Sequence, residues 1–188
     1  MQRLIVLLVC LVTAACAAPA GTIVEKPVPT ADPRVAARNV ASPVVQPLPL
    51  AADYLIVDKS ERLLVAYRAG KPIRAYRGIQ FGDAPRGHKR FEGDERTPEG
   101  VYTIDRRNPQ SSFHLSLGIS YPNARDRAYA AQYGRSAGGD IFIHGQPTGY
   151  SGPPLKGDWT DGCIALTNAE IEELWQIVPN GTPIEIRP

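Results

Sequence analysis

The sequence is poor in the residue types that carry redox and metal chemistry. Its 188 residues include three cysteines, three histidines, one methionine and two tryptophans. The histidines, at positions 88, 114 and 144, stand far apart and lack the short spacings typical of zinc-binding motifs. We therefore expect a protein that works without a metal ion or any other cofactor.

An excess of charge of one sign is also missing. Lys and Arg number 21 against 19 Asp and Glu, the formal net charge is +2, and no long basic run occurs. Binding to nucleic acid or to an anionic membrane surface depends on clustered positive charge. We expect no nucleic-acid partner, a monomer, and contact with a membrane only through a possible lipid anchor.

No apolar run reaches the roughly 20 residues that a membrane-spanning helix needs. The apolar run at 4–12 is far shorter, follows Arg3 and leads into small residues. This order is typical of an export signal, so we predict a signal segment at 1–16 and a periplasmic protein. Residues 12–16 resemble a lipoprotein box, in which Cys16 becomes the lipidated first residue and anchors the protein to the outer membrane; ordinary cleavage nearby is the alternative.

Proline is abundant in one part of the chain only. Residues 17–51 are rich in Pro, Ala and Val, with prolines at 19, 27, 29, 33, 43, 47 and 49. Proline removes a backbone donor and biases the preceding residue toward extended geometry, so no helix or strand pattern survives there. We predict a semi-rigid linker, with a disordered N-terminus as the alternative, and one domain at 52–188.

That domain has the pattern of a β protein, with short apolar segments separated by turns. In 112–119, apolar residues at 113, 115, 117 and 119 alternate with polar ones, which predicts a strand with one buried face. The other predicted strands are 54–58, 62–68, 73–80, 101–105, 141–143 and 182–187. We therefore predict a mostly β fold.

One or two short helices complete the prediction. Residues 125–134 form the weaker candidate. The stronger begins at Thr167, which forms a capping box with Glu170. An apolar stripe follows at helical spacing, made of Ile171, Leu174, Trp175 and Val178.

Cys163 is the one cysteine of the predicted domain, because Cys10 and Cys16 fall in the signal region. It has no partner for an intrachain disulfide. It lies between a polar turn and a capped helix, near backbone amides of the kind that favour a thiolate and hold an oxyanion. A buried structural cysteine is the alternative.

A cysteine nucleophile needs a base that works near neutral pH, and histidine is the natural one. His144 ends an apolar strand, and Gly145 after it is expected to leave room for a substrate beside the ring. The chain between His144 and Cys163 is long enough to bring both side chains together across neighbouring strands. A structural histidine is the alternative.

The segments 143–145 and 160–163, the loop 93–100 and the strand 113–118 together resemble the L,D-transpeptidase catalytic (YkuD-like) domain, over most of 53–188. The resemblance implies a compact β-sandwich. It implies that Cys163 is the acylated nucleophile, that His144 accepts and donates the proton, and that the Gly162 and Cys163 amides hold the oxyanion.

The resemblance also implies the substrate. Peptidoglycan stem tetrapeptides are cleaved between the L-centre of a diamino acid and the terminal D-amino acid. The acyl group then passes to another stem, to a wall-linked lipoprotein or to a free D-amino acid.

Two positions depart from the common family motif. Asp161 replaces a histidine, and Ala165 replaces an arginine that helps to hold a substrate carboxylate. The carboxylate of Asp161 is expected to raise the pKa of the neighbouring thiol. Residues 160–165 match a branch of the family that includes hydrolases. Three hypotheses stay open: a transpeptidase, a hydrolase (an L,D-carboxypeptidase or an amidase that releases wall-bound lipoprotein), and a non-catalytic wall-binding lipoprotein.

Further candidates for substrate binding surround the motif. Thr160 and Asp161 directly precede the Gly-Cys pair, Tyr150 lies in the loop before them, and Arg86 belongs to the basic loop 81–100. That loop either meets a substrate carboxylate or is simply solvated, and we expect its His88 to be solvated. His114, on the polar side of its strand, is a weaker candidate.

Overall fold

The computed structural model describes residues 50–188. The predicted signal segment with Cys16, and nearly all of the predicted linker, lie outside the described residues. Within the described part, no helix has both the length and the apolar character needed to cross a membrane.

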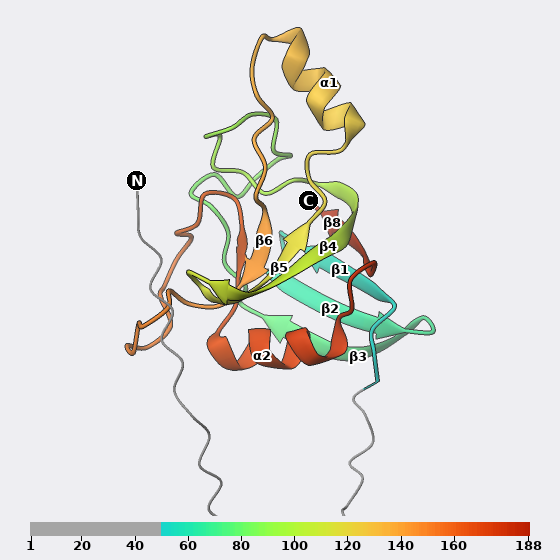
Figure 1. The fold of residues 1–188 in the computed structure, drawn as a ribbon, viewed down its shortest axis with the longest axis vertical. Helices are drawn as coiled ribbons and strands as arrows, with labels where there is room; N and C mark the ends of the chain where they lie inside the picture. Colours follow the sequence, from blue (N-terminus) through green and yellow to red (C-terminus); the bar gives the residue numbers. More distant parts are fainter. Residues whose placement is uncertain (1–49) are drawn as a thin grey trace, which may run out of the picture. The chain divides into compact units, whose positions relative to one another are not determined.

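The described chain is mostly β, as predicted (Figure 1). One eight-stranded sheet has the order β3-β2-β1-β8-β4-β5-β6-β7. Its strands are β1 (Tyr54–Asp58), β2 (Leu63–Arg68), β3 (Lys71–Arg77), β4 (Gly100–Ser111), β5 (His114–Ile119), β6 (Phe142–His144), β7 (Ile164–Ala165) and β8 (Pro183–Arg187).

The strand β4 joins the two halves of the sheet. Its first residues, 100–103, pair with β8, and from Ile104 onward it pairs with β5 through two register shifts. Figure 1 shows β4 as a long, curved strand. Fully buried side chains from both halves, among them Leu55, Leu64, Leu117 and Ile143, belong to one hydrophobic core.

Two helices accompany the sheet. Asn123 caps α1 (Ala124–Gln132). Thr167 caps α2 (Asn168–Ile177) through the predicted capping box with Glu170. Ile171 and Leu174 are fully buried, and α2 packs against β5 and β6. The helix therefore fixes the strands that precede the candidate site.

The predicted alternation along 112–119 was wrong in part. Leu117 and Ile119 are buried, but Phe113 is 37% exposed, and Ser116 and Gly118 are buried on the face predicted to be polar. The side chain of Arg106 lies where a Cβ of Gly118 would stand, so it covers that position. Both faces of β5 are therefore covered at this end.

Candidate active site

Strand register brings Cys163 and His144 to the same face of the sheet. The strands β6 and β7 run parallel with Ile143 opposite Ile164, and both isoleucines are fully buried in the core. Side chains alternate between the two faces of a strand. His144, one residue after Ile143, and Cys163, one residue before Ile164, therefore both point away from the core.

On that side lies a cavity of about 580 Å³. Four residues predicted from the sequence line it: His144, Cys163, Thr160 and Asp161. Its wall also includes the aromatic side chains Phe113, Phe142 and Trp159 and the polar residues Asp140 and Ser116. A volume of this size is ordinary for a small-molecule or peptide site.

His144 has the protonation pattern that a general base needs. Its Nδ1 atom lies 2.7 Å from the carbonyl oxygen of Gly145. A carbonyl only accepts, so Nδ1 carries the proton and Nε2 keeps a free lone pair. Burial lowers the pKa of His144, which keeps the ring neutral near pH 7. The ring packs against Phe113 and Trp159, with centroid distances of 4.6 and 5.6 Å.

The thiol of Cys163 is protonated in the resting site. Its pKa is raised to about 11, mainly by burial and to a smaller extent by the charge of Asp161. The Phe142 amide, whose nitrogen lies 3.4 Å from Sγ, lowers it. A backbone amide thus favours the thiolate, as expected, but burial outweighs its effect in this state. The thiol donates to the carbonyl oxygen of Asp140 at 3.5 Å, and no hydrogen bond joins it to His144 within residues 50–188.

Gly162 shapes the turn that presents the thiol. Its φ of +112° suits glycine, and a Cβ there would clash with the carbonyl oxygen of Arg96. Its own carbonyl accepts a hydrogen bond from Thr97 Oγ1 at 2.8 Å. Its amide donates to Thr160 Oγ1 at 3.2 Å, so it is not free to hold an oxyanion. In the described part of the chain the Cys163 amide has no such acceptor.

Thr160 holds both sides of this turn. Besides accepting from Gly162, its hydroxyl donates to the Cys163 carbonyl oxygen at 2.8 Å. Its amide donates to the carbonyl oxygen of Phe81 at 3.0 Å, which ties the turn to the loop 81–100. Thr160 is thus placed to position Cys163.

The family assignment comes from comparison with known proteins. The profile of the L,D-transpeptidase catalytic domain (YkuD) matches residues 52–186. The chain belongs to this family. It is 30% identical over 131 residues to L,D-transpeptidase YafK of Escherichia coli (strain K12). That match covers 66% of this chain and 46% of YafK, so the chain spans about half the length of that relative.

Solved structures similar to this L,D-transpeptidase domain include proteins from Campylobacter jejuni and Bdellovibrio bacteriovorus. The helical cell shape determining protein Pgp2 from Campylobacter jejuni has 28% identity and a TM-score of 0.56, covering 72% of this chain and 47% of Pgp2. Bd1075 from Bdellovibrio bacteriovorus has 26% identity and a TM-score of 0.50, covering 73% of this chain and 48% of that protein. Both similarities support the fold described above.

Three of the predicted substrate-binding residues lie elsewhere in this L,D-transpeptidase domain. A Cβ on Gly145 would stand 2.6 Å from Asn168 Oδ1 and 3.0 Å from Ile171 Cγ2, so α2 fills the room expected for a substrate. The Tyr150 hydroxyl donates to the carbonyl oxygen of Pro153, outside the cavity lining. Arg86 lines a separate cavity of about 430 Å³.

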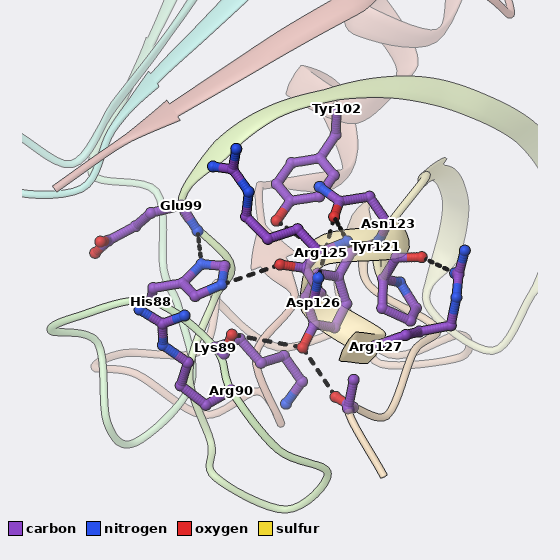
Figure 2. Close-up of polar contacts among 12 residues, drawn as sticks. His88, Lys89, Arg90, Glu99, Tyr102, Tyr121, Asn123, Arg125, Asp126 and Arg127 are labelled. Atoms are coloured by element: carbon purple, nitrogen blue, oxygen red, sulfur yellow. Dashed lines mark hydrogen bonds and ion pairs between the residues drawn. The ribbon is translucent and has the colours of Figure 1, made fainter. Parts of the chain in front are cut away.

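His88 is a structural residue of the domain, so the prediction of a solvated side chain was wrong. The Glu99 amide donates to its Nδ1 at 2.8 Å, and its Nε2 donates to Asp126 Oδ1 at 3.2 Å (Figure 2). The buried Asp126 carboxylate also accepts from the Tyr102 hydroxyl at 3.0 Å. These contacts tie the loop 81–100 to α1 and β4. His114 pairs with Glu172 at 2.6 Å, outside the cavity lining.

Sequence reasoning missed several residues of the cavity. Trp159 is held by a hydrogen bond from Nε1 to Gln80 Oε1 at 2.9 Å. Ser116 is the cross-strand partner of His144 in the β5–β6 pairing. Its position beside His144 depends on strand register, which no local motif encodes. Among the residues that the structure describes, no group of three or more His, Cys, Asp and Glu is placed to hold a metal ion.

Proposed function

We propose that this chain is an exported, periplasmic acyl-transfer enzyme that acts on peptidoglycan stem tetrapeptides, with Cys163 as nucleophile and His144 as general base. One observation carries the proposal: His144 at the end of β6 and Cys163 directly before β7 line one cavity, and the tautomer of His144 leaves Nε2 free to accept a proton. Membership of the L,D-transpeptidase family supports the substrate class.

In the proposed first half-reaction, Nε2 of His144 takes the proton from Sγ as Sγ attacks the carbonyl carbon of the diamino acid. The oxyanion that forms accepts a hydrogen bond from the Cys163 amide. When the intermediate collapses, the carbon–nitrogen bond breaks, and His144 passes its proton to the departing amine of the D-amino acid. The acyl group then remains on Cys163 as a thioester.

In the second half-reaction, an amine acceptor loses a proton to His144 and attacks the thioester carbon. The carbon–sulfur bond breaks, and His144 returns its proton to sulfur. The pKa of the thiol is raised and the pKa of His144 is lowered. Both shifts make proton transfer from the thiol to His144 unfavourable in the free site. We propose that it accompanies attack on a bound substrate rather than preceding it.

Hydrolysis of the same bond is the second candidate. The position at which the common motif carries an arginine is Ala165, which is 1% exposed, and among residues 50–188 no Lys or Arg lines the cavity. A cavity without a cation is poorly suited to holding a carboxylate of an acceptor D-amino acid or stem. Water would then take the place of the amine and release a tripeptide stem.

Product analysis on defined muropeptides tests the proposal. The purified domain and its Cys163→Ala variant are each incubated with a disaccharide-tetrapeptide, with and without a D-amino acid. Cross-linked dimers or exchanged termini indicate transfer, and tripeptides alone indicate hydrolysis. Equal product from both proteins would contradict catalysis by Cys163, and no product from either would favour a non-catalytic wall-binding protein.

Lipidation of Cys16 is proposed separately. Acylation at this position would anchor the protein to the outer membrane, and cleavage elsewhere would release it. Metabolic labelling with a fatty acid compares the full chain with its Cys16→Ser variant. Label that is present in the full chain and lost in the variant supports lipidation, whereas an unlabelled full chain contradicts it.

A further inference from the structure

The charge of the cavity at Cys163 is one-sided. Two acidic residues with exposed side chains, Asp140 and Asp161, belong to its lining, and in the described part of the chain no lysine or arginine does. The nearby cation Lys89 is buried, 3% exposed, and its ammonium group pairs with Asp94 at 3.0 Å. A ligand group that enters this cavity therefore meets acidic residues of the lining, and the lining contains no basic residue that would offset their charge.

Asp140 shows how a cation binds at this edge. The Arg106 guanidinium lies 2.8 Å from Asp140 Oδ1 and 4.6 Å from the centroid of the Phe142 ring. A carboxylate and an aromatic face thus already hold one cation beside the thiol. This pairing leaves Asp161 as the carboxylate of the cavity without a basic partner within residues 50–188.

The charge of Asp161 also acts on two neighbouring groups. Burial, followed by the charge of Asp161 and a hydrogen bond with it, raises the pKa of Glu95. The same charge acts on the Cys163 thiol in the same direction. A cation beside Asp161 would relieve both effects.

A second, independent observation comes from Ser116. This residue is 3% exposed, lines the cavity, and its hydroxyl has no hydrogen-bond partner in the described part of the chain. Its cross-strand partner is His144, so the hydroxyl opens onto the same space as the imidazole. The hydroxyl oxygen is not one of the fully buried side-chain atoms that lack a partner among residues 50–188, so it is open to the cavity and available to a ligand there.

We propose that the cavity beside Cys163 binds an ammonium group of the substrate, with the Asp161 carboxylate as counter-ion and the Ser116 hydroxyl as a neutral hydrogen-bonding partner. The aromatic side chain of Trp159, a residue that also lines the cavity, is a further favourable neighbour for a cation. This proposal rests on the proposed function and names the charge of the group that the site selects.

The ammonium group has two possible sources in the proposed reaction. One is the side-chain amine of the donor's diamino acid, which is present while the thioester forms. The other is the amine of the acceptor, which enters afterwards. In both cases the bound cation offsets the charge of Asp161 beside the thiol or the thioester.

The test follows thioester formation on Cys163 by intact-protein mass spectrometry, with two donor tetrapeptides. The two differ only in the side-chain amine of the diamino acid, which is free in one and N-acetylated in the other. The wild-type domain should react faster with the free amine, by about three- to ten-fold, as expected for one partly exposed ion pair. Asp161→Asn should remove this preference, and Ser116→Ala should reduce it.

Asp83→Asn is the matched control, since Asp83 is exposed and lies outside the cavity lining. It should keep the wild-type preference, and the wild-type preference should weaken as salt is added. A second stage adds an amine acceptor to the preformed thioester. A transfer rate that Asp161→Asn lowers at this stage only assigns the ammonium group to the acceptor.

Equal rates with both donors, together with transfer that is unchanged in Asp161→Asn, would overturn the proposal and leave the proposed function intact. A donor preference that survives in Asp161→Asn, together with an unchanged transfer rate at the second stage, would overturn it as well. The absence of a thioester from either donor would overturn the proposed function, and this inference with it.

Discussion

The Nδ1 atom of His144 donates a hydrogen bond to the carbonyl oxygen of Gly145 over 2.7 Å. This contact orients the ring and leaves Nε2 as the basic nitrogen. The ring stays within the same cavity as Cys163, although the thiol itself donates to Asp140 in the resting state. The arrangement indicates a site that is assembled but not ionised before substrate binds.

The first prediction concerns the reactivity of the thiol. Because burial raises the pKa of Cys163 to about 11, the free domain should react slowly with iodoacetamide at pH 7. The alkylation rate should rise with pH with a midpoint well above 8.5, the value of an ordinary cysteine. Asp161→Asn should move this midpoint downward. Fast alkylation at pH 7 would show that the thiolate already exists in the free domain.

The second prediction concerns His144 as the base. Substitution by glutamine should slow thioester formation by roughly 10²- to 10⁴-fold, the usual contribution of a positioned base. In the wild-type domain, the rate should fall as pH drops through the lowered pKa of His144, which lies below that of a free histidine. This acid limb should be absent from the residual activity of His144→Gln. The same limb in both proteins would assign the titration to another group.

The third prediction concerns the pH dependence of stability. Burial lowers the pKa values of His88 and His144 in the folded domain. The unfolded chain therefore binds more protons between each folded value and about 6.5, the pKa of a free histidine. The free energy of unfolding should be nearly flat just above pH 6.5 and should decrease as pH falls below it. Urea titrations at several pH values measure this slope.

His88→Gln should reduce that slope, because one of the two titrating groups is then missing. It should also lower the free energy of unfolding by about 1–3 kcal/mol, since the Glu99 amide and the Asp126 carboxylate each lose a partner. A variant with the stability and slope of the wild-type domain would contradict the structural role given to His88.

The fourth prediction concerns the turn before the thiol. Gly162→Ala should lower the free energy of unfolding by about 2–4 kcal/mol, because it adds a side chain at φ +112° against the Arg96 backbone. Gly149→Ala is the matched control, at φ +82° with nothing within 4 Å of its Cβ. It should cost about 1 kcal/mol. Equal losses of unfolding free energy in the two variants would show that the contact with the Arg96 backbone does not destabilise Gly162→Ala.

Much of the fold could be predicted because its signals are local. The Thr167–Glu170 capping box and the apolar positions Ile171 and Leu174 determine α2 within one short segment. In contrast, β7 has only two residues, too few for any periodicity to appear. The buried face of β5 was misjudged because Arg106, on a different strand, covers Gly118.

The candidate site likewise contains residues that a local motif predicts and residues that only the tertiary structure places there. Cys163 and His144 stand out by residue type and by their local motifs, and the structure places them in one cavity. Ser116 and Trp159 have no such signal, because their positions depend on β5–β6 register and on the loop that follows Gln80. The expectation of space for a substrate beside Gly145 was wrong because α2 packs there. This contact joins distant parts of the chain, so no local pattern predicts it.

The most direct test is the intact mass of the domain after brief incubation with a stem tetrapeptide. Acylation of Cys163 should increase the mass by that of the tripeptide acyl group, located at Cys163. It should be absent from Cys163→Ala and should form far more slowly in His144→Gln. An unmodified wild-type protein that still converts the tetrapeptide, or an adduct on another residue, would contradict catalysis by Cys163 with His144.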